Sequence, residues 1–131
     1  MKTSLVALLR TTALAGSVSG LGLSLPAHAQ SITDLGTLGG TNSYALRVSA
    51  DGSVIVGYSE IAGGAVRAYK YSGSTMVDLG TLTGGTTSLA LGVSADGSVI
   101  VGWSDIAGGA VRAFKYSGSA MVDLGTLGGT N

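Results

Sequence analysis

Few side chains in this sequence of 131 residues are suited to chemistry, and those few are mainly carboxylates, lysines and hydroxyls. Cysteine is absent, and the only histidine, His28, lies in an N-terminal segment that we expect to be removed. Residues 30–131 therefore offer no Ser-His-Asp or Cys-His catalytic arrangement and no imidazole or thiolate ligand for zinc. The sequence predicts a protein that is not an enzyme and that has neither a metal site nor a cofactor.

Two aspartates, Asp51 and Asp96, each precede a glycine in the sequence SADGS. Binding of Ca²⁺ would need several oxygen ligands at one point, and neither the spacing of an EF-hand nor that of a calcium-binding β-roll is present. An aspartate that accepts hydrogen bonds within its own turn is the simpler interpretation. Three further aspartates stand before Leu-Gly, and their repetition predicts a structural bond between repeat units: Asp34, Asp78 and Asp123.

Arginine and aromatic side chains are spaced two apart at two places, as Arg67 with Tyr69 and Arg112 with Phe114. Side chains two positions apart share one face of a strand, so each pair could form a cation–π or ligand-binding stripe. These four residues are the candidates for a binding surface. Packing between neighbouring sheets is the alternative interpretation.

The strongest signal in the sequence is an internal repeat with a period of 44 to 45 residues. The phrases DLGTLGG, DLGTLTGG and DLGTLGG begin at Asp34, Asp78 and Asp123, and the middle copy has one extra threonine. Residues 43–77 align without gaps on residues 88–122, and 29 of the 35 paired positions are identical. Such repetition predicts a modular fold.

Within each unit the hydrophobic pattern has a period of two, which is typical of strands. Turn signals at Asp51-Gly52, Gly63-Gly64 and Gly73-Ser74 divide the first unit. We expect its four strands at residues 44–49, 54–59, 65–72 and 75–82. Four short antiparallel strands in about 45 residues are the size of one β-propeller blade. The sequence thus predicts an all-β fold of blade-like units, with a β-solenoid of two rungs per repeat or a flat antiparallel sandwich as alternatives.

The first 29 residues are typical of a cleavable signal peptide. The uncharged apolar stretch, residues 11–25, is shorter than the roughly 20 residues that cross a bilayer. Pro26 ends this stretch, and Ala-His-Ala before Gln30 is a pattern that a signal peptidase cleaves. We therefore expect a bacterial protein that is secreted, periplasmic or at the cell surface.

The repeat divides the rest of the chain into three segments. Residues 30–42 contain a turn and, at residues 32–38, an orphan fourth strand of a preceding unit. Residues 43–87 form the first repeat unit, and residues 88–131 form the second unit and the start of the next linker.

Three of the repeated segments together resemble the HAF family of extracellular repeat proteins. The segments are DLGTLGG, VSADGSVIVG and RA[YF]KY, which begin at Asp34, Val48 and Arg67 and recur in the second unit. The resemblance implies propeller-like repeats in an exported bacterial protein, some members of the family ending in an autotransporter barrel. It implies no activity, and the histidine of the family's His-Ala-Phe triplet is replaced here by Arg67 and Arg112.

Residues 30–131 contain five basic and seven acidic residues, a net charge of −2, which gives no basic surface for nucleic acid or anionic membranes. Two units and an orphan strand cannot close a ring, because propellers typically have four or more blades. We therefore expect a fragment of a larger propeller-like protein, a non-catalytic exported module used for binding or surface display. Its expected partner is an extracellular protein or glycan, with edge-to-edge self-association as a further expectation and no membrane span.

Two other functions remain open from the sequence. One is an enzyme whose site forms only in the complete propeller, from the repeated aspartates and arginines. The other is a structural spacer without a ligand.

Overall fold

The computed structural model describes residues 30–129. The expected signal peptide, residues 1–29, lies outside the described residues. The described part of the chain forms eight strands, all of them within the unit that begins at Asp34. It contains no helix with the length and apolar character that crossing a bilayer requires.

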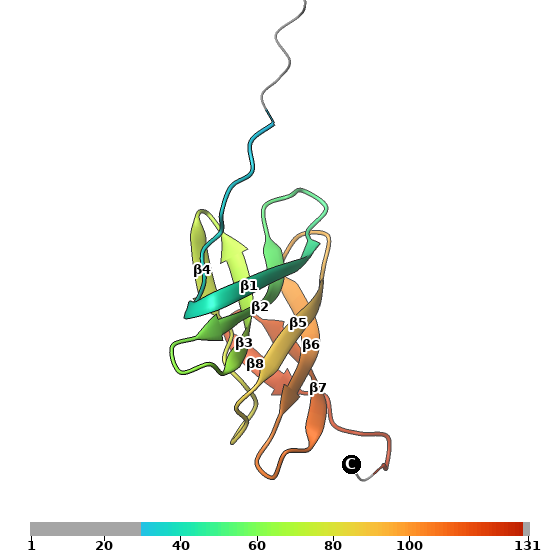
Figure 1. Ribbon diagram of the computed structural model, residues 1–131. Helices are drawn as coiled ribbons and strands as arrows, with labels where there is room; N and C mark the ends of the chain where they lie inside the picture. The colour runs from blue at the N-terminus through green and yellow to red at the C-terminus, as the bar shows by residue number, and fades with distance from the viewer. Residues whose placement is uncertain (1–29, 130–131) are drawn as a thin grey trace, which may run out of the picture. The chain divides into compact units, whose positions relative to one another are not determined.

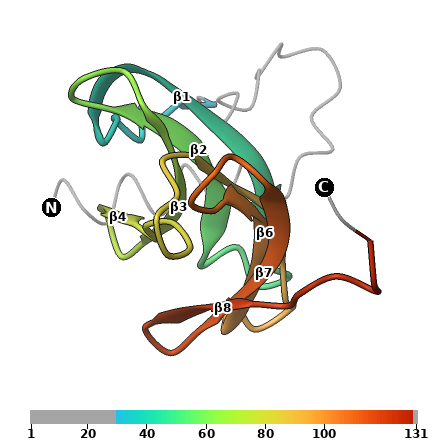
Figure 2. The same cartoon turned by 90° about the horizontal axis from the view of Figure 1, so that it is seen from below.

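The strands form two four-stranded antiparallel sheets, each with its strands in sequence order (Figures 1 and 2). This arrangement confirms the prediction of an all-β fold built from four-stranded antiparallel units. The first sheet contains β1 (Gly39–Val48), β2 (Ile55–Ile61), β3 (Val66–Ser72) and β4 (Thr75–Asp78). The second contains β5 (Ser88–Val93), β6 (Val99–Asp105), β7 (Val111–Ser117) and β8 (Ala120–Asp123).

The hairpin turns lie where the sequence signals place them. Gly73 and Ser74 join β3 to β4 with φ angles of 56° and 70°, as a two-residue hairpin loop of the primed type requires. Gly52, between β1 and β2, has a φ of 74°, and its N–H donates to the carbonyl oxygen of Ser49 at 2.9 Å. Residues with a side chain rarely adopt such angles, so these turns fix the strand lengths.

Several strand boundaries differ from the prediction: those of β2 and β3 by one or two residues, and those of β1 and β4 by more. β1 begins at Gly39 rather than Tyr44, because its first residue pairs with Ile61 across a register shift. The fourth strand ends at Asp78 rather than Leu82, where the aspartate side chain turns the chain. The orphan strand predicted at residues 32–38 is not formed, apart from a single bridge from Leu38 to Ile61. The equivalent strands β4 and β8 each pair with the strand that precedes them in a hairpin, β3 or β7. Residues 32–38 have no such partner, because the described residues before Asp34 contain no strand.

Buried side chains of both sheets meet in one apolar cluster, which we call the junction. β5 contacts β1, β2 and β3 of the first sheet (Figure 1). The first sheet and the connector that follows β4 contribute Val54, Val56, Ala68, Leu79 and Leu82. The second sheet contributes Ala90, Ile100 and Phe114. The two repeat units thus share a core.

Candidate functional site

The two aromatic residues predicted to bind a ligand are buried. Tyr69 on β3 is 1% exposed and Phe114 on β7 is 0% exposed. Each pairs with a glycine on the neighbouring strand, Tyr69 with Gly57 and Phe114 with Gly102. Burial raises the pKa of Tyr69. Phe114 belongs to the junction, so it packs between the sheets.

The two arginines lie beside these rings and are only partly accessible. Arg67 pairs with Ser59 and Arg112 pairs with Ser104, on the same faces as Tyr69 and Phe114. The Nε atom of Arg67 is buried and has no hydrogen-bond partner in the described structure. An open arginine–aromatic stripe is therefore absent from the described surface. The side chains share a face as predicted, but both aromatic rings on that face are buried, which the sequence pattern does not reveal.

Asp51 and Asp96 organise their own turns, as the simpler interpretation predicted. The Oδ1 atom of Asp51 accepts hydrogen bonds from Ser49 Oγ at 2.6 Å, Ser53 N at 3.0 Å and Ser53 Oγ at 2.8 Å. Asp96 makes the same three bonds with Ser94 and Ser98. These bonds, led by the serine hydroxyl two residues before, lower the pKa of each aspartate to about 2.

The three aspartates of the DLG phrases also act locally. Asp34, Asp78 and Asp123 each accept a hydrogen bond through Oδ1 from the N–H two residues later, at 2.7 to 2.9 Å. The expected structural bond therefore exists, but it closes a turn within one phrase and does not join two units. The receiving glycines have φ angles of 73° to 79°.

Two further acids join the start of one strand to the end of its neighbour. Glu60 accepts hydrogen bonds from Thr41 Oγ1 at 2.7 Å and Asn42 Nδ2 at 2.9 Å. Asp105 accepts the N–H groups of Thr86 and Thr87, both at 2.7 Å. These bonds lower the pKa of both carboxyl groups, for Glu60 mainly through Asn42 and for Asp105 mainly through Thr87.

The acids described above therefore accept hydrogen bonds that hold nearby turns and strand ends, and they do not cluster at one point. Within the described range no group of three or more His, Cys, Asp or Glu side chains could hold a metal ion. A pocket of about 350 Å³ lies between the connector and the second sheet, and its lining contains one carboxylate. Its lining residues are Thr81, Leu82, Thr83, Ile106, Ala107, Met121 and Asp123.

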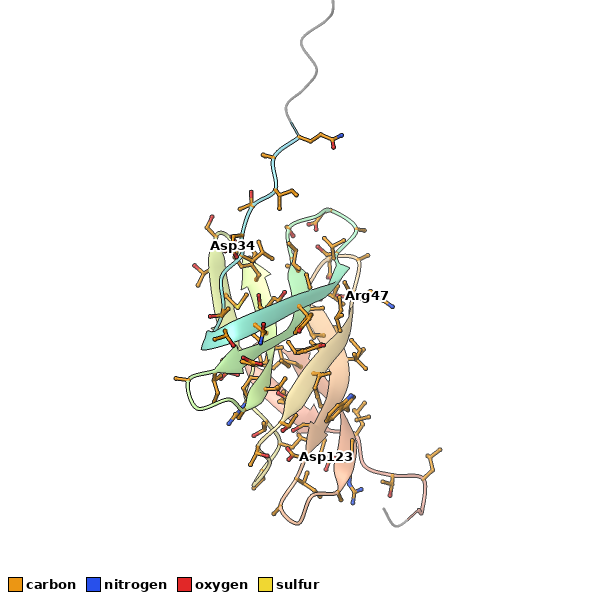
Figure 3. The ribbon with its side chains drawn as sticks, viewed as in Figure 1. Asp34, Arg47 and Asp123 are labelled. Carbon is orange, nitrogen blue, oxygen red and sulfur yellow. The ribbon has the colours of Figure 1, made fainter. Side chains whose placement is uncertain are left out.

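An exposed group of residues on β1 and β2 is a better candidate for a binding surface. Tyr44 and Tyr58 are paired across the strands, and their rings stack with centroids 4.8 Å apart. Arg47 pairs with Val56 on the same face and is exposed; its side chain extends away from the ribbon (Figure 3). Tyr44 is 49% exposed. We call Tyr44, Arg47 and Tyr58 the variable patch.

The variable patch coincides with the differences between the two repeats. Of the six differing positions, four lie on β1 and β2, at Tyr44, Arg47, Tyr58 and Glu60. The second repeat has leucine, glycine, tryptophan and aspartate there. The sequence alone gives the exchange of Tyr58 for tryptophan, but it does not give the register that brings Tyr44 opposite Tyr58. That register crosses an irregularity between Ala45 and Arg47.

Comparisons of the chain with protein-family models, with curated proteins and with solved structures give no match.

Proposed function

We propose that the chain is a non-catalytic exported repeat module of a larger bacterial extracellular or cell-surface protein, and that it binds an extracellular protein or glycan through the variable patch. The observation that carries this proposal is the concentration of repeat differences on one face of the first sheet, at the part of that face that lies beside the junction and stays wholly or partly exposed. Where repeats keep their core and change their surface, the changed surface is the one suited to a specific partner. Tyrosine and arginine are also the residue types that contribute most to protein interfaces.

The non-catalytic part of the proposal is supported by the engagement of the acids. Asp51, Asp96, Glu60 and Asp105 all have lowered pKa values because they accept hydrogen bonds from nearby serine, threonine or asparagine groups. A general acid needs a pKa close to the working pH, and these shifts run the other way.

The proposed architecture is a set of propeller-like blades of the HAF type. Its support is the order β1-β2-β3-β4 in each sheet and the face-to-face junction between consecutive sheets. Antiparallel order within each repeat favours blades over solenoid rungs, which stack in parallel. Export is proposed from the character of residues 1–29.

The binding proposal is tested with variants that convert the variable patch to the residues of the second repeat. Tyr44→Leu combined with Arg47→Gly should retain the fold, because β5 carries leucine and glycine at the equivalent positions. Thr75→Ala makes the same kind of conversion on β4, away from the patch, and is the matched control. The chain and both variants are applied to printed arrays of defined glycans and purified extracellular proteins.

We expect the chain and Thr75→Ala to bind the same array spots and the double variant to lose at least ten-fold in affinity. Equal binding by all three proteins would show that the patch is not the binding surface. Absence of binding on both arrays would favour the structural spacer. Cleavage of a printed glycan would favour the enzyme whose site forms from repeated acids.

A further inference from the structure

Each sheet has one face in the junction and one face at an end of the repeat pair. The two end faces are complementary to each other in the way that the two junction faces are. Within the pair, one face of the first sheet packs against the opposite face of the second sheet. The remaining face of the first sheet matches the buried face of the second except at Tyr69, which is Phe114 there. The remaining face of the second sheet keeps the junction residues Val56, Ala68 and Leu79 as Val101, Ala113 and Leu124, but it differs at the residues equivalent to Tyr44, Arg47, Tyr58 and Glu60. Asp34 and Asp123, which mark the two ends, lie far apart in Figure 3.

The free face of the second sheet, which we call the trailing face, consists of Val101, Ala113 and Leu124. Their equivalents in the first repeat form the junction. Val101 is 44% exposed where Val56 is 0% exposed, and Leu124 is 57% exposed where Leu79 is 7% exposed.

The other face of the first sheet is accessible only in part, because Tyr69 and Ser59 on it are already buried. We call its accessible residues Ser43, Ala45 and Val48 the leading face. Ala45 is exposed, whereas its equivalent Ala90 is fully buried in the junction. Val48 is 58% exposed, whereas its equivalent Val93 packs against the shared core. Both faces are mainly apolar and accessible, and the internal junction buries the equivalent residues of the other repeat.

The polar groups of the junction are matched in the same way. Ser88 Oγ accepts the N–H of Ala68 at 2.9 Å and donates to the carbonyl oxygen of Gly80 at 2.5 Å. Its equivalent Ser43 donates to Gly36 at 2.7 Å but accepts no hydrogen bond from the described residues. Ser43 therefore retains the acceptor that the backbone of a preceding sheet would occupy.

We propose that a second copy of this chain docks its trailing face on the leading face, so that copies associate head to tail through a repetition of the internal junction. In this arrangement Ala113 N–H of one copy reaches Ser43 Oγ of the next, as Ala68 N–H reaches Ser88 Oγ. The contact is heterologous, because it joins two different surfaces, and it generates rings or open filaments.

The DLGTLGG phrases of the two copies must share this contact. At the internal junction one phrase makes two hydrogen bonds, from Leu79 N to Ala68 O at 2.9 Å and from Leu82 N to Ser104 Oγ at 3.0 Å. In separate copies Leu124 N makes the first type of bond, to Ala113 O, and Leu38 N makes the second type, to Ser59 Oγ. Two docked copies thus already hold both bonds, and the proposal requires the residues of one phrase to leave the place that a single phrase fills at the internal junction.

Glutamate substitutions on each face test this proposal. Ala45→Glu blocks only the leading face, and Ala113→Glu blocks only the trailing face. Each variant alone has no complementary pair of faces, whereas a mixture of the two retains one. Val122→Lys is the matched control, because its equivalent Val77 stays 45% exposed with the junction formed. The average mass of the purified chain is measured by light scattering over a range of concentrations, and circular dichroism checks the fold.

We expect the mass of the unmodified chain and of Val122→Lys to rise with concentration beyond that of a dimer. Each glutamate variant should stay monomeric, and the equimolar mixture should form a dimer and nothing larger. If either variant does not fold, Val48→Lys and Val101→Lys carry the same test at exposed positions. An unmodified chain that is monomeric at about 1 mM would overturn the proposal. A mixture that stays monomeric would overturn it as well, because it would show that the association is not head to tail.

Discussion

Every aspartate that begins a loop in the repeats accepts the hydrogen bonds of that loop. Asp51 and Asp96 hold serine hydroxyls and backbone N–H groups, and Asp34, Asp78 and Asp123 hold the N–H of a glycine two residues on. Aspartate is suited to both tasks because its short side chain reaches its own backbone. The carboxylates of Asp51 and Asp96 act as acceptors in their bonds, so protonation of these two groups weakens the bonds.

The stability of the fold should therefore depend on pH in the acid range. Asp51 and Asp96 have a folded-state pKa of about 2, below the unfolded value of about 3.9. A lowered folded pKa stabilises the fold above pH 4, and this contribution is lost as the pH falls from about 4 to about 2. The midpoint of urea unfolding should fall over this window, and it should fall less in a variant with Asp51→Asn and Asp96→Asn.

Thr75→Ala, which changes an exposed hydroxyl and no carboxylate, should keep the pH dependence of the unmodified chain. An unchanged slope between pH 4 and pH 2 in the double asparagine variant would contradict the assignment.

The sequence could predict the role of Asp51 and Asp96 in their own turns. It did not predict that the bonds of Asp34, Asp78 and Asp123 stay within one phrase, nor which side chains are accessible. An Asp-Gly turn is a local property, and its hydrogen bonds lie within a few residues. Exposure of Tyr69 and Phe114 depends on which sheet face is covered, which is a property of residues 20 or more positions away. The burial of both rings therefore favours the alternative interpretation of these residues, packing between neighbouring sheets. The variable patch was missed because it depends on strand register.

Close approach of strands explains why certain glycines recur inside the sheets. A methyl group at Gly57 would overlap the carbonyl oxygen of Tyr44, and one at Gly102 would overlap that of Leu89. Gly57 on β2 lies opposite the irregular part of β1, and Gly102 on β6 lies opposite the irregular part of β5. The two sheets therefore depend on glycine at the same place, where a larger residue forces the strands apart.

Substitution of these glycines should be costly. Gly57→Ala should lower the free energy of unfolding by about 1–3 kcal/mol, because the backbone must shift to accept the methyl group. Gly129→Ala is the control, since a methyl group there meets no atom within 4 Å, and its effect should stay within about 0.5 kcal/mol. Urea titration of both variants measures the difference. Equal effects would show that the close approach does not limit the sheet.

Period-two patterning and turn signals predicted the number, order and antiparallel direction of strands in each repeat. The start of β1 was placed five residues late, because Gly39 and Gly40 carry no side-chain pattern that marks a strand. The end of β4 was placed four residues late, because the apolar residues Leu79 and Leu82 continue the alternation while serving the junction. Residues 32–38 have the fourth-strand sequence but lack the hairpin partner that makes a strand.

At the scale of the whole molecule, one junction joins both sheets into a single core. Leu82 lies in this core at 6% exposure, whereas its equivalent Leu127 is fully exposed. The same residue type at equivalent positions is thus buried in one repeat and exposed in the other. A substitution at Leu127 therefore serves as the control for the same substitution at Leu82, which measures the contribution of the junction to stability.

We expect Leu82→Ala to lower the free energy of unfolding by about 2–5 kcal/mol through the buried volume that it removes. Leu127→Ala should change it by no more than about 0.5 kcal/mol. Urea unfolding, followed by circular dichroism at a concentration too low for self-association, compares the two variants. Equal losses would mean that the sheets are not held together by the apolar junction.

The junction also bears on how such a gene can change length. Both sides of the junction are encoded within every repeat, so an in-frame duplication of one repeat creates a new sheet together with the surface that holds it. A deletion of one repeat brings two matching surfaces together again. Unequal recombination between near-identical repeats would therefore yield folded products of different lengths, with no further mutation needed to fit the new neighbours.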